Sequence, residues 1–407
     1  MMPPTATQDA IDAGLHALGR GALDEAAVRR HVAPLFGRVL ARNASRVYLA
    51  NHSLGRPLDA MDGDLLEATS AWYAHLGGAW DAWSAELEAF RGRLATLMGA
   101  PDAGCVVPKT SAGQGLRAVL NSFAHPPSVV ATRGEFDSLD VVLREYAHRG
   151  VARLALVEPD AAGDFEADAI VRAIVPGTDL VVLSQVMFQS GQVLPELGAI
   201  VAHAHARGAL VLLDVYHSLG VIPVEVGALD VDFAVGGSYK YLRGGPGACF
   251  LYVAPRVLGS GRRTLDIGWF AKDAPFTYAR PDPPRLAEGG GAWMESTPPI
   301  LTWYQARAGQ RFTLGIGVDR LRAQSLGLQT ALVALLAERG IAAQGGTAER
   351  GAFVVVRRDD AGALAERMRA EGIDVDARGP YLRLCPDVLT TADELRRAAD
   401  VLARVAA

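Results

Sequence analysis

Cysteine is scarce in this chain. Among 407 residues there are three, Cys105, Cys249 and Cys385, which lie far apart and form no CxxC pair. An odd and scattered set of thiols argues against a disulfide framework and against a structural zinc site. The pattern fits a reducing compartment, so we expect a cytoplasmic protein that holds no metal.

Long apolar runs and an excess of charge are missing as well. No stretch of about 18 apolar residues occurs, the length that a membrane-spanning helix needs, and the N-terminal segment lacks the apolar core of a signal peptide. With 45 acidic and 40 basic residues, the net charge of −5 is too near zero to indicate a nucleic-acid-binding protein. We therefore expect neither a membrane nor a nucleic acid as a partner, which leaves a small-molecule substrate.

What the sequence does contain is the balance of a globular protein, with 50% hydrophobic and 21% charged residues. Short runs rich in Val and Leu alternate with amphipathic helical stretches at 128–132, 153–158, 179–184, 209–214, 232–237 and 248–253. This alternation predicts an α/β fold with a mainly parallel sheet and helices on both faces. Ligands bind such sheets at the carboxyl ends of the strands.

The chain divides into three regions. Residues 1–45 have helical spacing, and 64–98 predict one further helix. Residues 256–300 are rich in Gly, Pro and Arg, and a long irregular segment within a compact domain is more often functional than idle. We expect a large α/β domain over 46–305 and a small α+β domain over 306–407. The N-terminal helical segment, 1–45, is expected to pack with the small domain.

Two residues at predicted strand ends point to one cofactor. Asp214 closes an apolar strand in LLDVYH, and Lys240 lies between two tyrosines in SYKYLRGGPG. Taken singly, the acid could cap a helix, and most lysines are solvated surface residues. Together they are what pyridoxal phosphate needs: a lysine for a Schiff base and an acid that keeps the pyridine nitrogen protonated.

A site for the phosphate and the ring completes this interpretation. Thr110 and Ser111 precede a predicted helix, whose N-terminal amides favour an anion. Phe136, just after the strand 128–132, is a candidate for stacking on the ring. A plain N-cap and a core phenylalanine are the simpler alternatives. The glycine-rich turn after Lys240 lacks the GxxxxGK[ST] pattern, so no P-loop is present.

In this order, the segments YLANHSLG, TSAGQGL, FDS, FQSGQ, DVYH, SYKYLRGGPG, GWF and STPPI identify a family. Over nearly its whole length the sequence resembles kynureninases, in the class V branch of fold-type I pyridoxal-phosphate enzymes. The resemblance implies a mainly parallel α/β large domain, a smaller C-terminal α+β domain and pyridoxal 5'-phosphate as the cofactor.

The resemblance also implies roles for individual residues. Lys240 would be the Schiff-base lysine, Asp214 the partner of the pyridine nitrogen, His217 a neighbour of the cofactor and Phe136 the stacking residue. Arg383 would hold the substrate's α-carboxylate as a bidentate fork. The residues expected around the phosphate are Ser111, Ala112, Ser138 and Tyr239. In a homodimer, Trp269 and Thr297 would reach the cofactor of the neighbouring subunit.

Three positions depart from the family pattern. Leu139 stands where the family has an acid, and Asp140 could replace that acid only with a shift of one residue. After the GWF segment, where the family commonly has Gly-His, Lys272 stands at the histidine position. Gln189 departs at a strand end, and we expect these three residues to surround the substrate side chain.

The implied reaction is hydrolysis of the Cβ–Cγ bond of a kynurenine-type amino acid to alanine and an anthranilate, with Tyr239 as a proton donor. A class V aminotransferase, or a lyase acting on another amino acid, is the alternative. A desulfurase is disfavoured because it needs a mobile cysteine, and all three cysteines lie in or beside apolar runs. A cofactor-binding regulator without activity is disfavoured because the lysine and the aspartate are both present.

Overall fold

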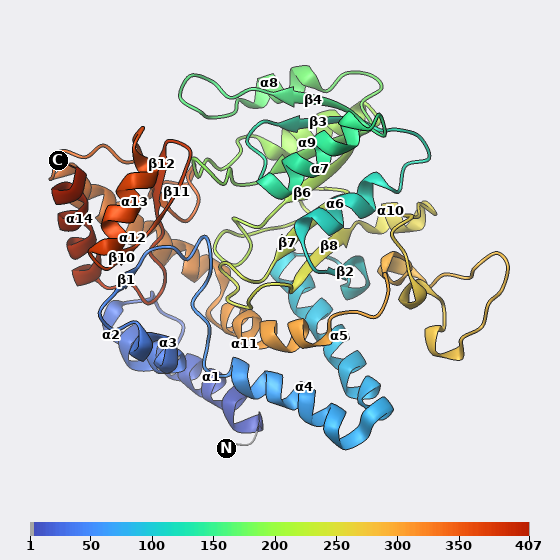
Figure 1. Cartoon of the computed structure of the whole chain (residues 1–407), viewed down its shortest axis with the longest axis horizontal. Coiled ribbons are helices and arrows are strands. Elements are labelled where there is room, and N and C mark those ends of the chain that lie inside the picture. Colours follow the sequence, from blue (N-terminus) through green and yellow to red (C-terminus); the bar gives the residue numbers. More distant parts are fainter. Residues whose placement is uncertain (1–3, 407) are drawn as a thin grey trace.

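The computed structural model describes residues 4–406 and places a seven-stranded sheet at the centre of the large domain (Figure 1). The strand order is β2-β8-β7-β6-β5-β3-β4, and β8 alone runs against its neighbours. The strands are β2 (Val106–Lys109), β3 (Ser128–Thr132), β4 (Arg153–Val157), β5 (Leu180–Ser184), β6 (Leu210–Asp214), β7 (Phe233–Gly237) and β8 (Cys249–Val253). The mainly parallel sheet predicted from the sequence is confirmed. The limits of the six expected strands agree within a residue, and β2 was not among them.

The central strands form because their apolar runs are buried along their whole length, whereas β4 at the edge of the sheet is buried only at Val157. Every residue of β5, β7 and β8 is buried, as expected for a sheet covered on both faces. The helices of this domain are α4 (Met61–His75), α5 (Ala79–Met98), α6 (Ala112–Leu120), α7 (Asp137–His148), α8 (Ala167–Ala173), α9 (Leu197–Ala206), α10 (Pro255–Gly259) and α11 (Ile300–Ile316). The parallel connections bring the carboxyl ends of β3, β5, β6 and β7 to one edge of the sheet.

The helical structure expected over 64–98 is confirmed except for one break. The chain forms α4 and α5, joined by a short 3-10 turn at Leu76–Gly78. Leu76 adopts a positive φ of 48°, which ends α4, and Gly77 and Gly78 complete the turn before α5. The Gly-Gly pair was the signal for this break.

The small domain contains a three-stranded antiparallel sheet in the order β11-β12-β9. Its strands are β9 (Val354–Arg357), β11 (Asp376–Arg378) and β12 (Tyr381–Leu384), and its helices are α12 (Val318–Ala337), α13 (Ala361–Ala370) and α14 (Ala392–Ala406). A separate parallel pair joins β1 (Val47–Tyr48) to β10 (Ile373–Asp374). Val47 and Leu49 are therefore buried in the small-domain core, although their sequence position is at the start of the large domain.

The N-terminal region forms a third apolar cluster. It contains α1 (Pro4–Leu18), α2 (Glu25–Ala27), the π-helical turn η1 (Val28–Val32), the 3-10 turn η2 (Ala33–Phe36) and α3 (Gly37–Arg42). Phe36 packs edge-on against Phe312 of α11, with ring centroids 5.3 Å apart, and Leu321, Val388 and Leu389 of the C-terminal region join the same cluster. Over residues 4–406, none of the helices has the length and apolar character needed to span a membrane.

Candidate active site

Lys240 and Asp214 meet at the carboxyl edge of the sheet. Asp214 is the last residue of β6, and Lys240 follows the adjacent strand β7. Both are buried, with exposed fractions of 5% and 4%. His217 lies in the turn after β6, and its Nε2 is 2.7 Å from Lys240 Nζ. The structure thus brings together the lysine, the acid and the histidine that the sequence singled out.

Burial shifts the proton affinities of all three groups. It lowers the pKa of Lys240 to about 7, although the nearby Asp214 carboxylate opposes the shift. It also raises the pKa of Asp214 to about 6, against the hydrogen bond from the Tyr216 backbone N–H (2.8 Å) and the charge of Lys240. Burial and the charge of Lys240 hold the pKa of His217 well below its ordinary value, so the imidazole is neutral. When Lys240 is protonated its ammonium can only donate, so in that form His217 Nε2 accepts the hydrogen bond.

Aromatic rings surround the lysine. Lys240 Nζ lies 5.3, 5.2 and 5.7 Å from the ring centroids of Phe136, Tyr216 and Tyr239. Phe136 in turn meets Phe188 edge-on at 5.3 Å, which fixes the orientation of its ring. Burial and the Asp214 charge raise the pKa of Tyr239 to about 12, so its phenol keeps its proton at neutral pH.

The residues expected around a phosphate gather at two helix starts. Ser111 caps α6 by accepting a hydrogen bond from the Gln114 backbone N–H (3.1 Å), and Ala112 is the first residue of that helix. Ser138 lies in the first turn of α7. A Cβ placed on Gly113 would be 3.7 Å from the Ser138 carbonyl oxygen, so the two helix starts lie side by side. Their free N–H groups favour an anion between them.

Trp269 and Thr297 lie together but apart from this group. Trp269 Nε1 donates to Thr297 Oγ1 at 3.1 Å. Within residues 4–406, no hydrogen bond or ring contact joins either of them to Lys240 or Phe136. Whether they complete the site of a second subunit stays a prediction.

Arg383 is held by groups of the protein itself. Its Nε and Nη2 donate to the two carboxylate oxygens of Asp376 at 2.7 and 2.6 Å, and its Nη1 donates to the Phe188 carbonyl. The guanidinium is 2% exposed and lies over the Phe353 ring at 5.5 Å. Three of its five N–H donors are thus engaged, which leaves one on each terminal nitrogen for a ligand.

Sequence reasoning missed the residues that support Arg383. His52 is fully buried, stacks on Phe353 at 4.9 Å, and its Nε2 is 2.8 Å from Asp376 Oδ1, while Ser53 Oγ donates to Asp376 Oδ2. Burial and the charge of Arg383 lower the pKa of His52 to about 4, so it is neutral and donates. Burial alone would raise the pKa of Asp376, but the bonds from His52 and Arg383 hold it well below its usual range. The sequence signal that could have identified His52 is its place in HSLG, part of the segment YLANHSLG that matches the family.

Two departures have outcomes in the structure. Leu139 has no exposed surface and packs in the large-domain core, and a contact with the substrate side chain stays a prediction. Asp140 does not replace the missing acid, since both of its oxygens accept from Arg144 Nε at 2.7 Å on the exposed side of α7. Gln189 and Lys272 are half-buried.

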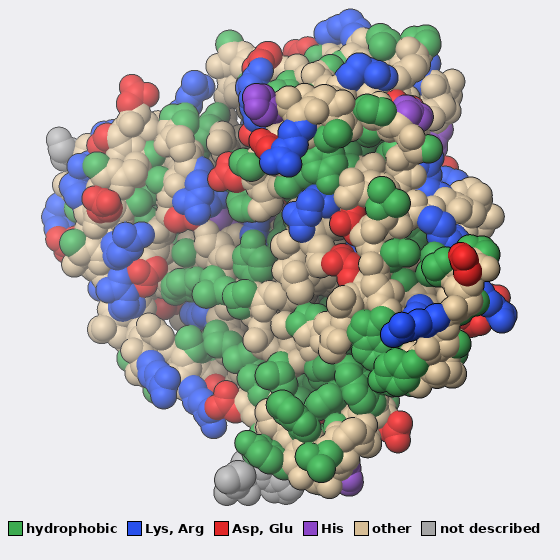
Figure 2. All heavy atoms as spheres, turned by 45° about the vertical axis from the view of Figure 1, so that its right-hand side comes forward, with side chains coloured by type: hydrophobic (Ala, Val, Ile, Leu, Met, Phe, Trp, Pro, Cys, Tyr) green, Lys and Arg blue, Asp and Glu red, His purple; other side chains and the backbone are tan. Residues whose placement is uncertain are grey.

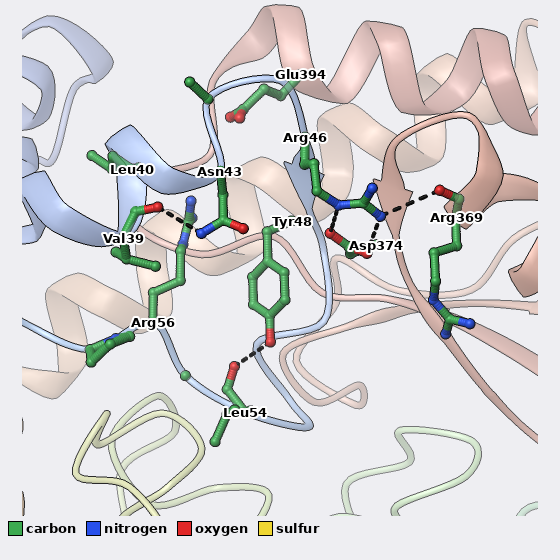
Figure 3. A pocket seen from close by; sticks show the side chains of 13 residues that line it. Val39, Leu40, Asn43, Arg46, Tyr48, Leu54, Arg56, Arg369, Asp374 and Glu394 are labelled. Carbon is green, nitrogen blue, oxygen red and sulfur yellow. Dashed lines mark hydrogen bonds and ion pairs between the residues drawn. The ribbon is translucent and has the colours of Figure 1, made fainter.

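A cavity of about 810 Å³ lies elsewhere, between α3, the segment 46–57 and the small domain (Figure 3). Arg46 forms an ion pair with Asp374 on its wall, and the Tyr48 hydroxyl donates to the Leu54 carbonyl (Figure 3). None of the expected site residues lines this cavity. The cavity borders the Lys240 segment only through Gly55, whose backbone N–H donates to the Tyr239 carbonyl at 2.8 Å.

The residues around Lys240 fit pyridoxal phosphate. Two buried polar atoms beside the lysine and the aspartate, His217 Nδ1 and Gln185 Oε1, have no hydrogen-bond partner among the described residues, as expected where a polar ligand binds. A buried lysine, a buried carboxyl, a fixed phenylalanine ring and paired helix starts supply one group for each part of the cofactor. Residues 4–406 contain no cluster of three or more His, Cys, Asp or Glu side chains that could hold a metal.

Comparison with known proteins agrees with this fit. A family model described as Aminotransferase class-V matches residues 70–380. The chain is 31% identical to a kynureninase of Salinispora tropica over 92% of each protein. It is also 30% identical to a kynureninase of Deinococcus radiodurans over 82% of this chain and 83% of that one.

Solved structures agree on the fold. The cystine C–S lyase C-DES with its product cysteine persulfide has a TM-score of 0.80 at 20% identity, covering 89% of this chain and 99% of that one. A cysteine desulfurase from Thermococcus onnurineus has a TM-score of 0.76 at 19% identity, covering 89% of this chain and 94% of the other. With the family match, the fold and a site that fits the cofactor, the chain belongs to the class V aminotransferase family, with the fold-type I architecture of these pyridoxal-phosphate-dependent enzymes.

Proposed function

We propose that the protein is a kynureninase-like hydrolase, which cleaves the Cβ–Cγ bond of kynurenine-type amino acids to give alanine and an anthranilate. The observation that carries the proposal is its similarity to proteins named kynureninase, which extends over 82% to 92% of this chain at 27% to 31% identity in the examples from Deinococcus, Salinispora and Bacillus cereus. An alignment over this share of the chain necessarily includes Lys240 and Asp214.

The cysteines argue against a desulfurase. Cys105, Cys249 and Cys385 are all buried and none is in a disulfide. Burial raises the pKa of each thiol, that of Cys249 to about 11. A thiolate nucleophile needs an exposed thiol with a lowered pKa, so none of the three is suited to accept sulfur from a substrate.

The chain supplies the proton-transfer groups of the reaction. When bound, the cofactor withdraws electrons from the α-carbon of the attached amino acid. Lys240 is the base for the α-proton, because its pKa of about 7 leaves much of the amine uncharged at neutral pH. His217 Nε2 orients that amine by accepting its hydrogen bond. Tyr239 keeps its proton and can donate it to the product carbon.

Arg383 is proposed to bind the α-carboxylate of the substrate. Its two remaining N–H donors, one on each terminal nitrogen, suit a carboxylate, while Asp376 fixes the plane of the guanidinium. The Phe188 carbonyl that Nη1 contacts follows β5, so the arginine of the small domain is tied to the edge of the sheet that carries Asp214. A carboxylate on Arg383 would therefore face the same edge of the sheet as the lysine.

A homodimer is part of the proposal. The irregular segment 256–300 packs Trp269 against Phe270, Phe276 and Tyr278, and Phe276 and Tyr278 are 46% and 69% exposed. The neighbouring end of α4 exposes Trp72, Tyr73 and Leu76. Figure 2 shows hydrophobic side chains gathered over the lower part of this face. Exposed aromatic surface of this extent is typical of an interface, and a second copy would bring Trp269 and Thr297 to its neighbour's cofactor.

Anthranilate fluorescence on addition of kynurenine tests the function. We expect fluorescence to rise with the holoenzyme and not with Lys240→Ala. A parallel Lys272→His variant tests whether the lysine in the Gly-His position weakens turnover, since it adds a positive charge near the expected aromatic end of the substrate. The contrary result is that the wild type and Lys272→His both fail to turn over kynurenine and yet change their cofactor spectrum with other amino acids. That result would refute the kynureninase proposal and leave the alternative class V reaction.

A further inference from the structure

One buried carboxyl beside the cofactor site is not used in the proposed reaction. Glu135 directly precedes Phe136 and is 3% exposed. Its Oε1 accepts a hydrogen bond from Thr132 Oγ1 at 2.7 Å, and its Oε2 accepts one from Ser184 Oγ at 2.6 Å. An isolated buried carboxyl is costly, so its position between two hydroxyls at the edge of the sheet needs a reason.

The two hydrogen bonds connect the parts that hold the cofactor. Thr132 and Ser184 are the last residues of β3 and β5. Ser184 is in register with Asp214 on the adjacent strand β6. Glu135 thus ties the β3–α7 turn, and with it the Phe136 ring 5.3 Å from Lys240 Nζ, to the strand end next to the acid.

We propose that Glu135 is a positioning residue of the cofactor site, which fixes the turn carrying Phe136 and places a second buried carboxyl beside Asp214. The inference rests on the cofactor site and not on the substrate, so it holds or fails whichever amino acid the enzyme uses.

The electrostatic surroundings support a functional role for the charge. Burial raises the pKa of Glu135 to about 7, the hydroxyls of Ser184 and Thr132 lower it, and the Asp214 carboxylate raises it further. Of the titratable groups on the packed elements, Asp214 on β6 acts on it directly, His217 after β6 is neutral, and Asp137 on α7 is exposed. Glu135 therefore changes charge within the working range of the enzyme, next to the acid that holds the pyridine nitrogen.

The test is the pH dependence of the visible absorbance of the holoenzyme. Glu135→Gln keeps the size of the side chain and removes its charge. Its one carbonyl oxygen can still accept from one hydroxyl, while its N–H₂ group must donate to the oxygen of the other. Since an ionised neighbour favours the protonated form of the lysine-bound cofactor, its loss should move the spectral transition to lower pH, by about half a unit or more. Glu135→Asp keeps the charge and should leave the transition near its wild-type position.

Glu145→Gln is the matched control, because Glu145 is an exposed carboxylate on α7, the helix that follows Glu135, and is paired with Arg149 at 2.5 Å. It should not move the transition. A Glu135→Gln transition that overlays that of the wild type, or that moves only as far as the Glu145→Gln transition, would overturn the proposal.

A second variant tests the connection itself, also in case Glu135→Gln does not fold. Ser184→Ala keeps the carboxyl but removes its bond to β5. The proposal requires the cofactor dissociation constant, measured by absorbance titration of cofactor-free protein, to rise about tenfold, the effect of losing one hydrogen bond to a charged group. An unchanged dissociation constant in this variant would show that Glu135 does not position the site.

Discussion

Asp376→Asn is the substitution whose effect the structure predicts in most detail. Asp376 accepts two hydrogen bonds from Arg383, one from His52 and one from Ser53. The side chains of Arg383 and Asp376 are 3% and 14% exposed, so solvent screens their charges little. Asparagine has nearly the same shape, but it offers one acceptor oxygen instead of two and carries no charge. The arginine would then be buried without a counter-ion.

Two magnitudes follow from that geometry. Removing one partner of a buried ion pair costs about 3 kcal/mol in the free energy of unfolding. A clamp that has lost its second carboxylate oxygen is no longer held in one plane, and a displacement of about 1 Å at such a group lowers kcat/KM about 100-fold. We therefore expect both a less stable protein and a marked loss of kcat/KM, carried mainly by a rise in KM.

Denaturant unfolding followed by circular dichroism, together with steady-state kinetics on kynurenine, measures both effects. Glu371→Gln is the matched control, because Glu371 also accepts two hydrogen bonds from one arginine, Arg404, at 3.1 and 2.9 Å, but its side chain is 41% exposed. Its loss should leave the free energy of unfolding nearly unchanged, because solvent screens an exposed ion pair. If Asp376→Asn loses stability but keeps its kcat/KM, Arg383 is a structural residue and does not bind the substrate carboxylate.

Three further predictions concern the cofactor site. Borohydride reduction should fix the cofactor covalently on Lys240, and Lys240→Ala should stay colourless under the same treatment; a variant with wild-type absorbance would refute the assignment. Gly55→Ala would place a Cβ 2.0 Å from the Lys240 backbone oxygen, so we expect weaker cofactor binding and a loss of about 1 to 3 kcal/mol in the free energy of unfolding, measured by melting. The control is Gly362→Ala, whose Cβ would meet nothing within 4 Å and which should be neutral or slightly stabilising in the same assay. In cofactor-free protein, Glu135 binds its proton more tightly in the folded than in the unfolded state, because burial raises its pKa from 4.5 to about 7. The free energy of unfolding should therefore fall by up to about 3 kcal/mol as pH rises from about 4.5 to about 7. Glu135→Gln should flatten that part of the profile, and an unchanged profile would contradict the raised pKa.

The sheet was predictable because its signal is local. Runs such as 128–132 and 210–214 are short, rich in Val or Leu and followed by turn residues, so hydrophobicity alone marks them. The break at Leu76 was missed because apolar spacing continues across it, while the glycines that end the first helix interrupt that spacing only briefly. Pairing of β1 with β10 was not predictable, since it joins residues 47 and 373, and no local pattern specifies a partner so far along the chain.

The site divides in the same way. Asp214, His217 and Lys240 were found because they follow apolar strands, where ligands of α/β sheets bind. His52 and Asp376 were missed because each acts through the other across 324 residues. Glu135 also follows a predicted strand, 128–132, so the same rule applied to it. The prediction at that strand end named only its neighbour Phe136.

Quantifying both products of one reaction tests the proposed function most directly. The purified holoenzyme is incubated with kynurenine, and alanine and anthranilate are measured together by liquid chromatography and mass spectrometry. A kynureninase-like hydrolase yields the two in equimolar amounts, and Lys240→Ala yields neither. Formation of a keto acid that depends on an added amino acceptor, with no anthranilate, would contradict the proposal and identify an aminotransferase instead.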